Sequence, residues 1–372
     1  MPARWLGLAM ETDVTPERAE GSATSPQDDP IRGVARGDSP VPLSVLDLST
    51  VGVAHSPADA LNTTTELARG VEQWGFHRLW VAEHHGMPGI ASSAPAVVIA
   101  HLAAHTSSLR LGSGGVMLPN HAPLVVAEQF GTLQALHPGR IDLGIGRAPG
   151  TDQATARALR RTTGPLSVDD FPQQLGELIA FLGDDFPVDH PYAAIQSVPH
   201  GPTPPIWLLG SSGFSAQLAG ELGLPFAFAH HFSAQNTVPA LELYRRSFRP
   251  SEVLDEPYAL IGVQTVAADS DEEALDIIRP VALSMLRLRR GMPGKQPSRR
   301  EAREYPYSEL ERSFLDSWLA DAVHGAPDTV RAGLDELRER TGADELMLTA
   351  NVPDRDTKLH SFELIAKAYR MI

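Results

Sequence analysis

Five short clusters of histidine, arginine, serine and glycine have the residue types needed to bind an anionic ligand or to transfer a proton. Each cluster lies at or just after an apolar run of strand length, where the sites of parallel α/β folds usually form. The clusters are Glu83–Gly86, Gly112–Gly115, Gly146–Gly150, Gly210–Gly213 and His230–His231.

The Gly210–Gly213 segment precedes a helical pattern, so free N–H groups and the positive end of a helix could bind a phosphate there. The hydroxyl groups of Ser211, Ser212 and Ser215 would add donors. A serine N-cap between flexible glycines explains the same residues equally well. Arg147 follows another predicted strand and could contact the same phosphate through two hydrogen bonds. A surface salt bridge is the more common role for a single arginine.

Two pairs of adjacent histidines, His84–His85 and His230–His231, could bind a metal or transfer protons. Neighbouring residues of an extended segment point in opposite directions, so both members of a pair rarely bind one ion. The sequence also lacks an HExxH motif, and we therefore expect no metal site. One histidine of each pair is expected to act as an acid, a base or a hydrogen-bonding group, whereas His85 and His231 could instead hydrogen-bond local backbone.

The Gly114–Gly115 pair would let the backbone approach a flat ligand closely, although a bend in the strand is the simpler explanation. Residues Gly144–Gly150 (GIGRAPG) resemble a dinucleotide fingerprint, but the spacing is one residue too long and Pro149 disturbs it. No acidic residue closes a clear second strand about 20 positions later. The sequence therefore does not predict an NAD-binding Rossmann fold.

Alternating apolar and helical patterns predict a parallel α/β fold that would position these clusters. The apolar runs are typical of strands buried on both faces. Eight strand–helix units match a (β/α)₈ TIM barrel with insertions in the βα loops, and a doubly wound open sheet is the alternative. The predicted strands span residues 43–51, 78–82, 109–118, 140–145, 205–209, 226–229, 260–267 and 345–350.

Composition narrows the class of protein. The chain has 372 residues, a formal net charge of −15 and no cysteine, which excludes disulfides and thiolate metal sites and offers no basic stripe for nucleic acid. No apolar run is long enough to span a membrane and the start does not resemble a signal peptide, so we expect a cytoplasmic protein. Residues 1–42 are predicted to be a flexible extension, and residues 43–372 a single domain.

Three segments together resemble the bacterial luciferase-like flavin-dependent monooxygenases. They are WVAEHHG, AHLAAHTSSLRLGSGGVMLPNHAPLVVAEQF and HPGRIDLGIGR, and the resemblance runs from about residue 43 to at least residue 232 and includes the eighth strand. The segment GSSGFSAQLA is similar to a subgroup found in bacterial secondary-metabolite pathways, including antibiotic biosynthesis. The resemblance implies a TIM barrel that binds FMN.

The resemblance also implies roles for individual residues. His84 would be the active-site histidine beside the flavin, and a cis peptide at Gly114–Gly115 would lie under its ring. Gly146 replaces a reactive cysteine of luciferase, so light emission is not expected. The cofactor-binding residues that the resemblance implies are His85, Gly114, Gly115, Arg147, Ser211, Ser212, Gly213, Ser215 and His230.

The implied activity is oxygenation of a small organic substrate by O₂ and FMNH₂, which a separate flavin reductase would supply because no NAD site is visible. Residues 287–305 fall where the family has a mobile lid, although a solvated connector would have the same composition. A homodimer formed through the second and third helices is also implied. Two alternatives are a deazaflavin-dependent hydride-transfer enzyme and a non-catalytic flavin-binding partner subunit.

Overall fold

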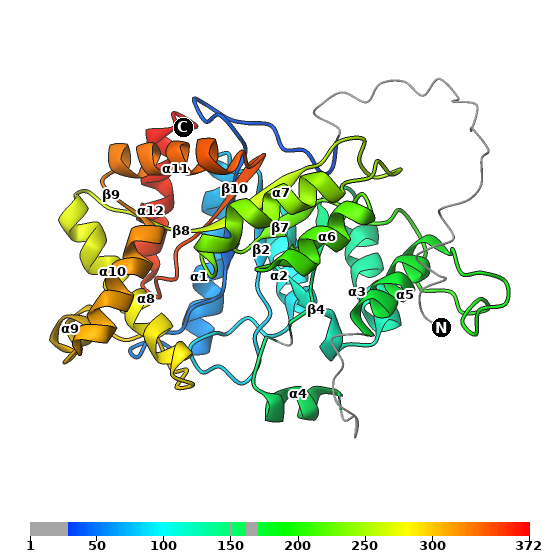
Figure 1. The fold of residues 1–372 in the computed structure, drawn as a ribbon, viewed down its shortest axis with the longest axis horizontal. Helices are drawn as coiled ribbons and strands as arrows, with labels where there is room; N and C mark the ends of the chain where they lie inside the picture. The colour runs from blue at the N-terminus through cyan, green and yellow to red at the C-terminus, as the bar shows by residue number, and fades with distance from the viewer. Residues whose placement is uncertain (1–28, 149, 161–169) are drawn as a thin grey trace.

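The eight main strands form a closed parallel barrel, with helices on its outer side (Figure 1). The structure is a computed structural model and describes residues 29–148, 150–160 and 170–372. The last strand pairs with both the first strand and β8, which closes the barrel and excludes the open-sheet alternative. In order around the barrel the strands are β1 (Leu43–Asp47), β2 (Arg78–Val81), β3 (Arg110–Ser113), β5 (Ile141–Gly146), β6 (Ile206–Gly210), β7 (Phe226–Phe228), β8 (Ala259–Ala267) and β10 (Glu345–Thr349).

Several helices begin at a side chain that caps their first turn. Ser56 and Asp59 form a capping box at the start of the first helix, with Pro57 in its first turn. The helices are α1 (Pro57–Gln73), α2 (Pro95–His105), α3 (Pro123–Leu136), α4 (Gln153–Arg160), α5 (Phe171–Gly183), α6 (Gly213–Glu221), α7 (Thr237–Ser247), α8 (Asp271–Arg289), α9 (Arg299–Glu304), α10 (Glu309–Asp321), α11 (Pro327–Thr341) and α12 (Arg355–Ala368). None of these helices has both the length and the apolar character needed to cross a membrane.

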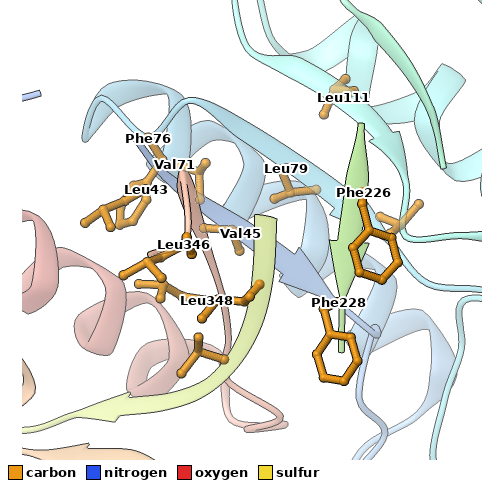
Figure 2. Close-up of a cluster of buried hydrophobic side chains, with 14 of the residues drawn as sticks. Leu43, Val45, Val71, Phe76, Leu79, Leu111, Phe226, Phe228, Leu346 and Leu348 are labelled. Atoms are coloured by element: carbon orange, nitrogen blue, oxygen red, sulfur yellow. The ribbon is translucent and has the colours of Figure 1, made fainter. Parts of the chain in front are cut away.

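Alternate residues of each strand divide the apolar core into two layers. Outward-facing residues such as Val45 and Leu348 pack against the surrounding helices, together with Val71 and Phe76 (Figure 2). Inward-facing residues fill the barrel itself, and they include Leu46, Trp80, Trp207, Leu260 and Met347. The two layers explain why the strands read as continuous apolar runs.

A buried ion network closes the N-terminal end of the barrel. The Arg78 guanidinium lies 2.9 Å from Glu345 Oε1 and 2.9 Å from Asp142 Oδ2, and all three side chains are fully buried. Arg78 also donates a 2.6 Å hydrogen bond to the carbonyl of Ile31. Since this end is filled, a ligand can enter the barrel only from the opposite end, where the βα loops lie.

One expectation about the elements was wrong. The predicted strand over 109–118 is divided, because the backbone turns at Gly114–Gly115 before the short strand β4 (Val116–Met117). α10 ends at Asp321, and the short strand β9 (Val323–Gly325) extends the sheet beside β8. Pro280 does not interrupt α8, because buried neighbours such as Ile277 and Val281 keep that helix packed despite the missing N–H group.

The flexible extension predicted for residues 1–42 does not hold for residues 29–42. Ile31 and Val41 are buried, and Arg78 and the C-terminal Tyr369 hydrogen-bond to this segment. Few apolar residues suffice here because the barrel bottom supplies the partner surface. Residues 1–28 lie outside the described residues.

Candidate active site

A cavity of about 490 Å³ opens at the C-terminal ends of the strands. Its deeper wall is apolar and comes from inward-facing strand residues, whereas its rim carries polar residues of the βα loops. Seven of the ten predicted site residues line it. The residues brought together are His84, Gly114, Gly115, Arg147, Ser211, Ser212 and Ser215.

The first turn of α6 and Arg147 form a cationic edge of this cavity. Ser212 occupies the N-cap position of α6, but its side chain makes no capping hydrogen bond, so the N-cap explanation of this segment does not account for it. Gly213 does not line the cavity itself, but it begins the helix. Arg147 forms no ion pair with any described residue, and its guanidinium carbon lies 4.1 Å from the centroid of the Phe214 ring. A free guanidinium beside a helix N-terminus and serine hydroxyls can bind a phosphate.

His84 presents one ring nitrogen for chemistry in the cavity. Its Nδ1 lies 3.2 Å from the carbonyl oxygen of Gly150. Because a carbonyl only accepts hydrogen bonds, Nδ1 carries the proton in the neutral ring and Nε2 is left as an acceptor. Burial lowers the pKa of His84. The side chain is therefore suited to take up a proton at Nε2 and to release it again.

The structure places His231, and not His230, in the wall of the cavity. His231 lines the cavity, and its Nδ1 lies 3.0 Å from the carbonyl of Gly262, so its Nε2 is also left as an acceptor. Burial lowers the pKa of His231. His230 does not line this cavity. It is buried with its Nδ1 2.8 Å from Thr237 Oγ1, and burial lowers its pKa to about 4. His230 therefore lies outside this cavity, and its flavin contact stays a prediction.

The two glycines of the predicted flat floor line the cavity, and the peptide bond between them is cis, as the resemblance implies. A Cβ on Gly114 would lie 2.7 Å from Leu46 Cδ1, and one on Gly115 would lie 2.8 Å from the carbonyl oxygen of Gly144. Larger residues would therefore collide with the barrel wall. The absence of side chains here leaves the backbone exposed to a planar ligand.

His85 does not line the cavity, contrary to the cofactor-binding role that was expected. Its Nε2 lies 2.8 Å from Glu83 Oε1, and Nε2 of His121 lies 2.8 Å from the same oxygen. The backbone N–H of Met117 donates to the other oxygen of Glu83, whose side chain is fully buried. The three side chains have the spacing of a three-ligand metal cluster. The hydrogen bonds of Glu83 with His85 and His121 also connect the loop after β2 to the loop after β4.

The segment predicted to be a lid is partly helical. It contains the last turn of α8 and the short helix α9, and Leu288 reaches the cavity wall. Backbone hydrogen bonds of 2.9 Å join Gln296 to Val51 and Val53. The segment therefore packs against the loop after β1, and it is more than a solvated connector.

Sequence reasoning missed the remaining cavity residues for identifiable reasons. Apolar loop residues carry no recognisable chemistry, and the pairing of Glu83 with His121 joins segments that no short motif connects. The histidine pattern could have identified His231, because both members of the pair were candidates. The missed residues include Met87, Met117, Thr151, His231, Phe232 and Leu288.

Comparisons with known proteins agree with this geometry. A family model described as luciferase-like monooxygenase matches residues 41–345. A luciferase-like monooxygenase of Escherichia coli (strain K12) is 45% identical over 328 residues, which are 88% of this chain and 96% of that protein. The N-acetyl-S-alkylcysteine monooxygenase of Bacillus subtilis (strain 168) is 36% identical over 328 residues, 88% of this chain and 97% of that protein. The crystal structure of apo-MsnO8 shares 37% identity with a TM-score of 0.81, and the match covers 89% of this chain and 99% of that one.

Proposed function

Since this chain belongs to the luciferase-like monooxygenase family and is an oxidoreductase, we propose that it binds FMN in the barrel cavity and oxygenates a small organic substrate. The observation that supports FMN is the meeting of a cationic edge and a flat backbone floor in one cavity. The first turn of α6 and Arg147 would hold the phosphate, and Gly114–Gly115 would lie against the ring. Reduced FMN supplies electrons to O₂ when bound in such a site.

The chain's own residues would bind, orient and manage protons. His84 and His231 each offer an Nε2 acceptor to the cavity, so either can hold a proton that moves to or from the reacting oxygen. The apolar wall formed by Leu46, Leu209 and Leu260 would exclude water from the ring. Leu288 and the segment 287–305 would close over the opening as a lid.

The substrate class that we favour is a small thioether. Support comes from the Bacillus subtilis relative, whose name gives an S-alkylated cysteine as its substrate. A thioether sulfur is a soft nucleophile, so the protein need only hold it over the ring in the apolar part of the cavity. A secondary-metabolite substrate, which the sequence resemblance implies, is the alternative to a small thioether.

Two partners complete the proposed function. A separate reductase would supply FMNH₂, since the sequence shows no NAD fingerprint. A second copy of the chain would pack on α2 and α3, which together expose Val97, Val125 and Leu136 to between 45% and 69%. Such apolar exposure is typical of a surface that another molecule covers.

The deazaflavin alternative keeps the same barrel. Two solved structures with 20% and 16% identity to this chain have this fold and are complexes with FMN and with an F420–acetone adduct respectively, so the fold alone does not choose the cofactor. A non-catalytic partner subunit would need the phosphate edge but not the two histidine acceptors. Tighter binding of F420 than of FMN in a fluorescence titration would favour the first alternative.

The test of the proposed function combines flavin binding with oxygen chemistry. We expect the protein to bind FMN and, with a flavin reductase, to couple O₂ consumption to sulfoxide formation from a thioether. His84→Ala should keep FMN affinity within about twofold and reduce product formation by roughly a hundredfold or more. His137→Ala, outside the cavity, is the matched control. Full turnover by the His84→Ala variant would remove His84 from the mechanism.

A further inference from the structure

A second pocket of about 210 Å³ lies beside the cavity, under α10. Its walls come from the loop after β7, from β8, from the end of α8 and from α10. His231 and Phe232 line both spaces, and Leu288 of the cavity is followed directly by Arg289 of the pocket. The pocket could hold far more than one water molecule, for which about 15 Å³ suffices. One ligand could therefore occupy both spaces.

Two opposite charges without partners line this second pocket. Arg289 and Asp321 form no ion pair with any described residue, and the Arg289 guanidinium carbon lies 4.6 Å from the centroid of the Phe314 ring. The neighbouring arginines, Arg287 of α8 and Arg290 at its C-cap, differ in this respect. Arg287 lies 2.7 Å from a carboxylate oxygen of Glu301, and Arg290 is paired in the same way with Glu311. Of these three arginines, only Arg289 lines the pocket and only Arg289 lacks a carboxylate partner.

The pocket wall also contains a buried polar nitrogen without a partner. Gln264 is 2% exposed, and its Nε2 has no hydrogen-bond partner among the described residues. Asn351 donates to Gln264 Oε1 at 3.0 Å, which fixes the amide so that Nε2 remains a free donor. A buried donor without a partner destabilises the folded protein. An anionic ligand in the pocket would reduce this destabilisation.

We propose that this second pocket binds the head group of the substrate, a carboxylate with a neighbouring N–H donor, as in an amino acid or an N-acyl amino acid. Arg289 would bind the carboxylate with help from Gln264, and Asp321 would accept from the N–H group. The side chain of the substrate would then pass His231 and Phe232 into the cavity. The assignment rests on the proposed function for the reactive end of the substrate.

The experiment compares an N-acyl amino acid with two analogues, each of which differs from it in charge at one group. The probes are N-acetyl-S-methylcysteine, its carboxamide and S-methylcysteine, and calorimetry measures their binding to the full-length protein with and without FMN. Wild-type protein should bind the carboxylate at least about tenfold more tightly than the carboxamide, as a charge-assisted hydrogen bond implies. Arg289→Leu should abolish this preference and leave FMN affinity unchanged.

Two further variants keep the result specific to the pocket. Arg312→Leu removes an exposed charge from α10 outside the pocket and should leave the preference intact. Asp321→Asn should weaken S-methylcysteine more than the N-acetyl probe, because its ammonium group depends more on a negative partner.

Equal binding of carboxylate and carboxamide by wild type, or equal losses for both in Arg289→Leu, would overturn the inference. Failure to bind FMN with an Arg289-dependent preference retained would overturn only the proposed function.

Discussion

At the N-terminal end of the barrel, Arg78 has two buried carboxylate partners, whereas at the opposite end Arg147 has none among the described residues. The first arginine is fully enclosed and its hydrogen bonds are satisfied within the protein. The second lies at the edge of a cavity, stacked on an aromatic ring, with its charge available. The difference separates residues that maintain the barrel from residues that can bind a ligand, although both are arginines near strand ends.

The largest expected effect concerns the closed end. Arg78→Met leaves Glu345 buried without a cation and leaves Asp142 with Arg110 as its remaining partner, so the free energy of unfolding should fall by about 3–5 kcal/mol. Arg147→Met should change it by less than about 0.5 kcal/mol. Urea denaturation followed by circular dichroism measures both values. Equal losses in the two variants would contradict the division between the two ends.

A second effect comes from His230, which is buried beside the open end. Because burial lowers its pKa to about 4, the unfolded chain binds more protons than the folded protein between about pH 6.5 and pH 4. Its contribution is present above pH 6.5 and is lost as the pH falls, by up to about 3 kcal/mol. The difference in unfolding free energy between wild type and His230→Gln should therefore shrink between pH 7.5 and pH 5. A difference independent of pH would show that His230 is not held neutral.

The smallest expected effect tests whether the open end binds the phosphate of the flavin. Arg147→Leu removes the guanidinium from the proposed phosphate site, which should weaken FMN binding by about 1.5–3 kcal/mol, roughly ten- to a hundredfold. Riboflavin has the same ring system but no phosphate, so its affinity should be unchanged. Quenching of flavin fluorescence measures both affinities. An equal loss for both flavins would place Arg147 at the ring instead of the phosphate.

The sequence was sufficient to predict the barrel and most of the polar residues at its open end. Buried parallel strands read as apolar runs, and residues that follow them meet at one end, so His84, Arg147 and Ser211 could be grouped without a structure. The paired charges of the closed end could not be grouped in this way. Arg78 and Glu345 stand at the starts of strands far apart in the chain, and only barrel closure brings them together.

The errors arose where regular alternation ends. β7 ends at Phe228, so the alternation of side chains along the strand does not predict which of the two following histidines faces the cavity. The sequence analysis favoured His230, whereas His231 lines the cavity. The second pocket could not be predicted from the sequence for a related reason. Its charged residues stand on α8 and α10, whose packing over the barrel end depends on tertiary contacts that no local pattern contains.

Closure of the sheet has a consequence during synthesis of the chain. β10 supplies the hydrogen-bonding partner for one edge of β1 and for residues 260–264 of β8, yet it is the last of the described strands to be synthesised. Until then both edges remain unpaired, and unpaired edges are templates for association with other chains. The nascent protein therefore needs protection for almost the whole of its translation, and no shorter translation product has the closed ring of strands from which the cofactor cavity is built.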